Sequence, residues 1–143
     1  DAVLCLGEAG RPVISLERVA LNLMDYCIPD NNGVTATDQP IQENGPAAYF
    51  SRLPLRVIQS ALLAAGIPCE ISLTAGAYLC NQVFYTLMDH LATQGQDILA
   101  GFIHLPSLPE QVALRGSNQS SMALDRIPFT KYNILLDQYA ALS

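Results

Sequence analysis

The sequence predicts an α/β fold, specifically a three-layer α/β/α sandwich with a twisted, mixed sheet. The first observation is that helix and strand patterns alternate in the second half of the chain, over 54–65, 69–73, 79–91 and 98–105. The second is that two strand patterns, over 2–6 and 13–25, come first without a helix between them. Alternation of this kind is typical of parallel strands whose connecting helices cover the sheet.

Composition indicates a single globular domain over residues 1–143, with enough chain for one core. Half of the residues are hydrophobic and 14% are charged. This apolar balance predicts that some surface is buried in a homo-oligomer, a dimer or a tetramer. The formal charge of −6 argues against nucleic-acid and anionic-membrane partners. No apolar run approaches the length of a membrane span.

The four cysteines show neither zinc-type spacing nor the pattern of a small secreted scaffold. Cys5 and Cys69 fall in strands that we expect to be buried, which suits reduced thiols. We therefore predict a cytoplasmic protein, and we expect neither a metal nor an organic cofactor.

The elements of the first half follow from short local patterns. Residues 2–6 are continuously apolar, which favours a central strand covered on both faces, and a Gly-rich turn over 7–11 follows. Alternation over 13–25 predicts one strand, with Val19, Leu21 and Leu23 on one side. The segment 30–48 has little periodicity, so we expect a long loop near the active site or an interface.

The elements of the second half are better marked. Pro54 suits a first helical turn, Leu55, Ile58 and Leu62 form an apolar face, and Gly66 ends the helix. A buried strand over 69–73 leads through a small-residue turn into a second helix, with a stripe of apolar residues at every fourth position: Leu79, Val83, Leu87 and Leu91. After the strand 98–105, prolines predict an irregular stretch, and 122–142 has weak helical character.

Cys80 is the first candidate for chemistry because it falls in the first turn of the second helix. Unpaired N–H groups there favour a thiolate and can hold a developing oxyanion. A thiolate at such a turn is a plausible nucleophile. The alternative is that Cys80 is a small core hydrophobe.

His104 and Glu17 complete the candidate set. His104 closes an apolar strand, and in an open α/β sheet strand ends and the following helix starts share the ligand-binding edge, so we expect Cys80 and His104 to face one crevice. The alternative is a structural histidine. By its pattern alone, Glu17 is a solvated carboxylate at a strand end. His90 lies late on the Cys80 helix and is interpreted as a helix-end residue.

Several motifs together resemble the active-site pattern of the pyroglutamyl peptidase I family, cysteine peptidases that remove an N-terminal pyroglutamyl residue. The likeness runs from about Leu6 to about Met122, and its motifs are Glu17–Asn22, Ile28–Asn31, Ala48–Ser51, Leu53–Pro54, Ala75–Asn81 with Tyr85, and Gly101–Pro106. The resemblance implies that Cys80 is the nucleophile, that His104 is the general base and then acid, and that Glu17 orients His104.

The resemblance also implies peptides with an N-terminal pyroglutamate as substrates and a phosphorylase/hydrolase-like fold. The family has a longer N-terminal part, so we expect that this chain lacks an upstream segment. It also has Gln where Glu8 stands and Arg where Cys27 stands. Two alternatives stay open: a different thiol amidohydrolase that acts on a glutamine-type amide, and a catalytically silent homologue that only assembles or binds.

Overall fold

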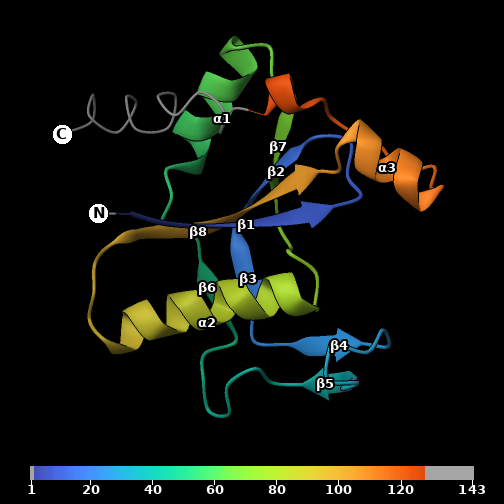
Figure 1. Ribbon diagram of the computed structural model, residues 1–143. Coiled ribbons are helices and arrows are strands. Elements are labelled where there is room, and N and C mark those ends of the chain that lie inside the picture. Colours follow the sequence, from blue (N-terminus) through green and yellow to red (C-terminus); the bar gives the residue numbers. More distant parts are fainter. Residues whose placement is uncertain (1, 128–143) are drawn as a thin grey trace. The chain divides into compact units, whose positions relative to one another are not determined.

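The computed structural model describes residues 2–127 as an arrangement of short strands and helices (Figure 1). The strands are β1 Ala2–Ala9, β2 Ile14–Glu17, β3 Val19–Leu21, β4 Met24–Tyr26, β5 Ala36–Gln39, β6 Ala48–Phe50, β7 Cys69–Ser72 and β8 Leu99–Pro106. The helices are α1 Leu55–Ala64, α2 Leu79–Thr93, α3 Pro109–Arg115 and the 3-10 turn η1 Leu124–Arg126.

Four strands form one sheet in the order β1-β8-β2-β7, and two further sheets are the antiparallel pairs β3 with β6 and β4 with β5. The described residues divide into two compact units. Unit 1 comprises 2–5, 17–53 and 72–102, and unit 2 comprises 6–16, 54–71 and 103–127.

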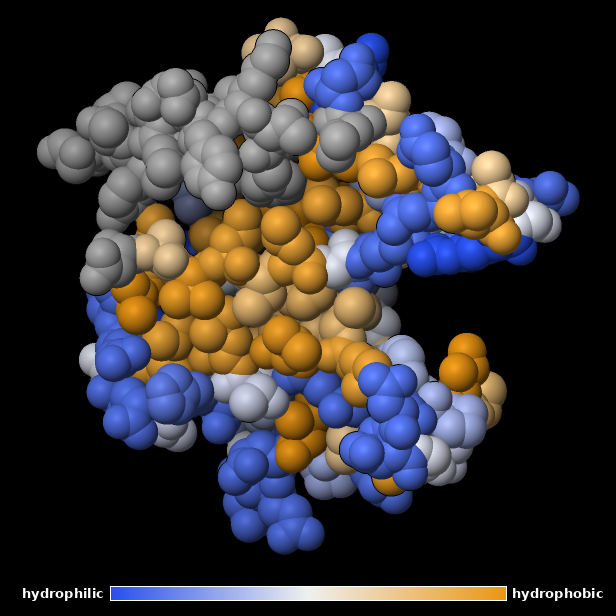
Figure 2. Space-filling view, viewed as in Figure 1, coloured by the Kyte–Doolittle hydropathy of each residue, from blue (hydrophilic) through white to orange (hydrophobic). Residues whose placement is uncertain are grey.

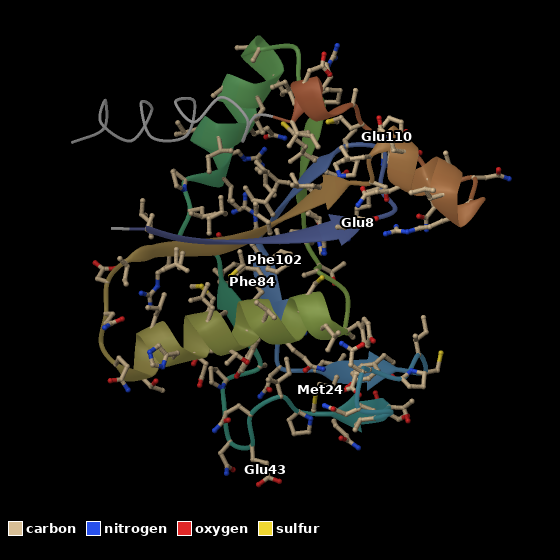
Figure 3. The ribbon with its side chains drawn as sticks, viewed as in Figure 1. Glu8, Met24, Glu43, Phe84, Phe102 and Glu110 are labelled. Atoms are coloured by element: carbon tan, nitrogen blue, oxygen red, sulfur yellow. The ribbon has the colours of Figure 1, made fainter. Side chains whose placement is uncertain are left out.

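The core of unit 1 forms where α2 packs against β3 and β6. Phe84 of α2 and Phe102 of β8 point toward each other, with ring centroids 6.0 Å apart (Figure 3). Tyr49 and Tyr85 form a second aromatic pair at 5.1 Å. The fully buried members of this cluster are Ala20, Ala75, Phe84, Tyr85, Met88, Leu91, Ala100 and Phe102.

The predicted helix α2 is present, and its apolar stripe is buried only in part, since Leu91 is buried and Leu87 is half-buried. Leu79 and Val83 are exposed, at 38% and 49%, whereas the buried face carries Asn81, Phe84, Tyr85, Met88 and Leu91. Both stripes have helical spacing, so local periodicity does not choose between them. The larger aromatic residues lie on the face that meets β3 and β6, because they bury more apolar area there.

The single strand predicted over 13–25 is three strands, β2, β3 and β4, and Glu17 ends the first of them instead of beginning a strand. The predicted long loop over 30–48 is also wrong in part, since it contains β5. In unit 1, β5 pairs with β4, and Asp38 and Asn44 adopt positive φ angles of 48° and 62° in this region. The connection between β4 and β5 contains the turn of Asp30 and Gly33, where the Gly33 amide donates to the Asp30 carbonyl at 2.9 Å and Gly33 has a φ of 78°.

The first strand is longer and more exposed than the sequence predicts. β1 extends through the expected Gly-rich turn to Ala9, and it lies at the end of the four-strand order. Apolar residues reach the visible surface (Figure 2), and Val3 and Leu6 of β1 are 36% and 47% exposed. Within the described residues β1 is therefore an edge strand. Leu73, expected in a buried strand, is 69% exposed after the end of β7.

In unit 2, the predicted face of α1 is confirmed. Leu55, Ile58 and Leu62 are its buried residues, Pro54 is its N-cap, and Gly66 follows with a φ of 71°. The stretch after Pro106 was predicted to be irregular because of its prolines, but it contains the helix α3. Pro109 occupies the first turn of α3, where a missing N–H costs nothing, and Gly116 ends it in the left-handed conformation.

No helix within residues 2–127 is long and apolar enough to span a bilayer. The helical character expected over 122–142 lies mostly outside the described residues, which hold the short turn η1 from that range.

Candidate active site

Cys80 is the second residue of α2, as the sequence predicts. The preceding residue Tyr78 is extended, with φ −107° and ψ −160°, and its side chain does not cap the helix. The first turn carries no acidic side chain either, so the amides of this turn are not neutralised by a carboxylate from within it. Cys80 is half-buried and packs against the core of unit 1, which places its thiol at the edge of that core.

The turn before α2 is held by its own short hydrogen bonds. The Thr74 amide donates to Ser72 Oγ at 3.2 Å, Ser72 Oγ donates to the Thr74 carbonyl at 3.0 Å, and the Gly76 amide donates to Thr74 Oγ1 at 3.0 Å. Gly76 has a φ of 85°, a conformation that side chains other than glycine rarely adopt. The route from β7 into the Cys80 helix is therefore defined by the residues that the sequence marks as a turn.

The segment around β4 borders the same helix start. The Asp25 amide donates to the Ala77 carbonyl at 3.1 Å, and Tyr78 Oη donates to the Pro29 carbonyl at 3.3 Å. The rings of Tyr26 and Tyr78 meet edge to face at 4.7 Å. Two aromatic rings and one extended segment thus lie next to the first turn that carries Cys80.

Asn81 is the residue that sequence reasoning missed. It is wholly buried and bonds to the backbone of the β3 segment three times. Its Nδ2 donates to the carbonyls of Leu21 and Leu23 at 2.9 and 3.0 Å, and its Oδ1 accepts from the Leu21 amide at 2.9 Å. One feature of the sequence could have indicated that Asn81 is buried, since it shares the helical spacing of Phe84, Tyr85 and Met88.

Glu17 is the last residue of β2 and is 0% exposed. The alternative of a solvated strand-end carboxylate is therefore wrong. Beside it, the Arg18 amide donates to the Ser72 carbonyl at 2.8 Å, which connects this segment to the turn that leads into α2. A buried carboxylate is costly unless it is paired, so Glu17 has the burial expected of a residue with a defined polar role.

His104 is the sixth residue of β8 and is 4% exposed. Glu17 and Cys80 belong to unit 1, whereas His104 belongs to unit 2. Phe102, two residues earlier, lies in the core of unit 1 at 2% exposure. His90 lies in the last turn of α2 and is exposed, as expected of a helix-end residue.

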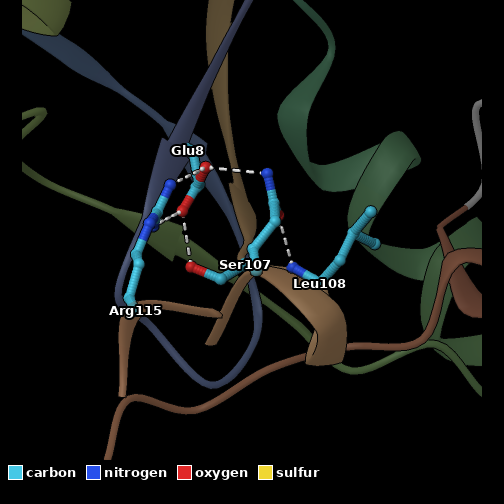
Figure 4. A network of polar contacts seen from close by, with 5 residues as sticks. Glu8, Ser107, Leu108 and Arg115 are labelled. Atoms are coloured by element: carbon cyan, nitrogen blue, oxygen red, sulfur yellow. Dashed lines mark hydrogen bonds and ion pairs between the residues drawn. The ribbon is translucent and has the colours of Figure 1, made fainter. Parts of the chain in front are cut away.

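In unit 2, Glu8 holds together the end of β1 and α3 (Figure 4). Glu8 Oε1 accepts from Ser107 Oγ at 2.6 Å, Glu8 pairs with the Arg115 guanidinium, and Gln111 Nε2 donates to Glu8 Oε2 at 3.3 Å. Hydrogen bonds from Arg115 and then Ser107 hold the pKa of the Glu8 carboxyl below its usual range. These contacts are structural, because they fix α3 to the strand.

Among residues 2–127, no group of three or more His, Cys, Asp or Glu side chains is placed to hold a metal ion. The four cysteines, all within this range, are free thiols, of which Cys27 is exposed and the others are half-buried.

A family model described as pyroglutamyl peptidase matches residues 1–130. The chain belongs to the pyroglutamyl peptidase family. Its similar relatives include pyrrolidone-carboxylate peptidases from Gloeobacter violaceus, 56% identical over 125 residues, and from Brevibacillus brevis, 52% identical over 128 residues. These matches cover 87% and 89% of this chain and 60% and 59% of the relatives, so the chain spans about 60% of their length.

Solved structures of the family support the same assignment. The pyroglutamyl peptidase I from Bacillus amyloliquefaciens matches with a TM-score of 0.88 and 40% identity, over 98% of this chain and 66% of that chain. A mutant pyrrolidone carboxyl peptidase from Pyrococcus furiosus matches with a TM-score of 0.89 and 38% identity, over 99% and 70%. The likeness to the pyroglutamyl peptidases confirms both the predicted family and the predicted α/β fold class.

Proposed function

We propose that the protein carrying this chain is a cysteine peptidase that removes an N-terminal pyroglutamyl residue from peptides. The observation that carries the proposal is the position of Cys80 at the start of α2, in a chain that matches the pyroglutamyl peptidase family over residues 1–130. The proposed catalytic residues are Cys80, His104 and Glu17.

The proposed reaction starts with attack of the Cys80 thiolate on the peptide carbonyl carbon that joins an N-terminal 5-oxoproline to the next residue. Backbone N–H groups in the first turn of α2 stabilise the resulting oxyanion. The C–N bond to the next residue then breaks, and protonated His104 gives its proton to the departing amine. A thioester between Cys80 and the pyroglutamyl group remains, and the peptide without its first residue leaves.

Hydrolysis of the thioester completes the cycle. His104 takes a proton from water, the hydroxyl oxygen adds to the thioester carbonyl, and the Cys80 thiolate departs with release of pyroglutamate. Glu17 has the role of holding one ring nitrogen of His104 and stabilising the imidazolium that forms. Burial of Glu17 and His104, at 0% and 4% exposure, supports a defined polar role for each, because a buried ionisable group is costly unless it has a polar partner.

The test is hydrolysis of a pyroglutamyl anilide by the full-length protein and three variants. Cys80→Ala and His104→Ala should abolish turnover, because neither the nucleophile nor the proton carrier has a substitute. Glu17→Gln should leave measurable activity, because Glu17 orients and stabilises but does not transfer a proton. Active-site titration with an alkylating reagent separates an active enzyme from a catalytically silent homologue. Hydrolysis of a glutamine analogue without cleavage of the anilide would favour the alternative of a different thiol amidohydrolase.

The proposal extends to assembly and location. Exposed large apolar residues in unit 1, among them Ile28, Val34 and Val83, support a homo-oligomer, a dimer or tetramer. The proposed location is the cytoplasm, which suits the free thiols of the described chain. Light scattering at several concentrations tests the assembly, and a monomer at the highest concentration would contradict it.

A further inference from the structure

The tie between Asn81 and the β3 segment lies in unit 1, one residue from Cys80. The Asn81 side chain uses both amide hydrogens and its carbonyl oxygen, bonding to Leu21 twice and to Leu23 once. The side-chain amide of asparagine supplies two N–H donors and one oxygen acceptor, a combination that neither Asp nor Ser offers. The Asn81 side chain is 0% exposed, and loss of these bonds removes the partners of backbone groups in the half-buried residues Leu21 and Leu23.

The partner of this tie is itself held in place. Leu21 of β3 pairs with Ala48 of β6, and the Asn22 amide donates to the Ala47 carbonyl at 2.9 Å. β3 is therefore held in place by β6, and the Asn81 side chain attaches the first turn of α2 to β3. The other contacts at this end of α2 include the backbone bond from the Asp25 amide to the Ala77 carbonyl and the bond from the partly exposed Tyr78 side chain to the Pro29 carbonyl.

From this geometry we infer that Asn81 is a positioning residue, which sets the place of the Cys80 thiol and of the first-turn amides relative to β3. The catalytic part of this inference rests on the proposed peptidase function. Displacing a reacting atom by about 1 Å can lower a rate by about 100-fold, so a shift of the first turn should lower kcat. Substrate binding depends on other surfaces, so KM should change less.

Asn22 provides a matched control. Its side chain also makes three bonds to backbone, with Nδ2 donating to Gln42 and Gly45 carbonyls at 2.9 and 3.4 Å and Oδ1 accepting from the Gln42 amide at 2.9 Å. These bonds attach β3 to a loop and not to α2. Asn81→Ala and Asn22→Ala thus remove the same groups, and of these two side chains only that of Asn81 connects α2 to the β3 segment.

The experiment uses the full-length protein and compares melting temperature, kcat and KM for a pyroglutamyl anilide, and the rate of Cys80 alkylation by iodoacetamide. We expect Asn81→Ala to lower kcat by about 10- to 100-fold with KM within about three-fold, and Asn22→Ala to keep kcat within about two-fold. Equal kcat losses in the two variants, at temperatures where both are folded, would overturn the inference.

The alkylation rate keeps the test independent of peptidase activity. We expect Asn81→Ala to change the Cys80 alkylation rate by at least about three-fold while Asn22→Ala leaves it near the parent value. If the parent protein cleaves no anilide, the proposed function fails and this comparison still decides the role of Asn81. If Asn81→Ala does not fold, Asn81→Ser, whose hydroxyl retains one hydrogen bond, takes its place, and an unchanged alkylation rate overturns the inference.

Discussion

Ser107 Oγ donates a hydrogen bond of 2.6 Å to Glu8 Oε1, which joins residues 99 positions apart in the sequence. Ser107 is wholly buried, whereas the Arg115 and Glu8 side chains of the same network are 51% and 34% exposed. A buried hydroxyl therefore anchors a carboxylate whose charged partner is largely in water. The network stabilises the junction of β1 and α3 within unit 2.

Glu8 should make stability depend on pH in the acid range. The folded-state pKa of Glu8 is lowered, so its contribution is complete above the unfolded value near 4.3 and is lost as pH falls through the folded value. Glu8→Gln should lose a small amount of stability at pH 7, because exposed ion pairs contribute little, and the difference from the parent should shrink toward pH 3. Urea unfolding at both pH values measures it, and a constant difference would contradict the prediction.

Gly101 has no room for a side chain. A Cβ at this position would lie 2.5 Å from Ser51 Oγ and 2.6 Å from Leu53 Cδ1, both in unit 1. Gly101→Ala should cost about 1–3 kcal/mol of unfolding free energy through overpacking. Gly10→Ala is the control, since its nearest atoms, at 3.0 Å, belong to the flexible end of Gln119. Urea unfolding of both variants compares them, and equal losses would rule out the packing explanation.

Tyr49 should ionise late in an alkaline titration. Burial and then its hydrogen bond to Asp89, at 2.8 Å, raise the pKa of Tyr49 to about 12. A raised folded-state value means that the associated stability is complete below the unfolded value near 10 and is lost as pH rises toward 12. Tyrosinate absorbance should show a late step that Tyr49→Phe removes. A parent titration that ends near pH 10 would contradict this.

The four thiols should react at different rates. Burial raises the pKa of the Cys5 and Cys69 thiols, so these two should be alkylated slowly at neutral pH. Cys80 should react fastest because it lies at a helix start, and we expect at least an about ten-fold advantage over Cys5 and Cys69. Cys27 is exposed and serves as the internal reference. Brief iodoacetamide labelling and peptide mapping give the order, and faster labelling of Cys27 than of Cys80 would show that exposure outweighs the helix start.

The sequence by itself determined the features that depend on neighbours along the chain. The face of α1 with Leu55, Ile58 and Leu62 follows from spacing and from Pro54 and Gly66 at its ends. The place of Cys80 in the first turn of α2 follows from the small-residue turn before it. Motif spacing also sufficed to predict the family, because its residues occur in a fixed order.

Tertiary structure decided which of several possible faces is buried. α2 carries two apolar stripes, and contact with β3 and β6 selects Phe84, Tyr85 and Met88 over Leu79 and Val83. The same contact gives Asn81 its partners, which lie about 60 positions earlier in the chain. Hydrophobic burial and hydrogen bonding depend on distance in space, so local patterns do not reveal them.

Strand position in the sheet was decided in the same way. An apolar run over 2–6 is compatible with a central strand or an edge strand, and the order β1-β8-β2-β7 places it at the end of the sheet. Burial of Glu17 likewise depends on what surrounds the end of β2, since the residue itself is as polar as an exposed glutamate. The sequence therefore determined where the candidate residues occur along the chain, and folding determined their environments, because burial depends on chain segments that are distant in sequence.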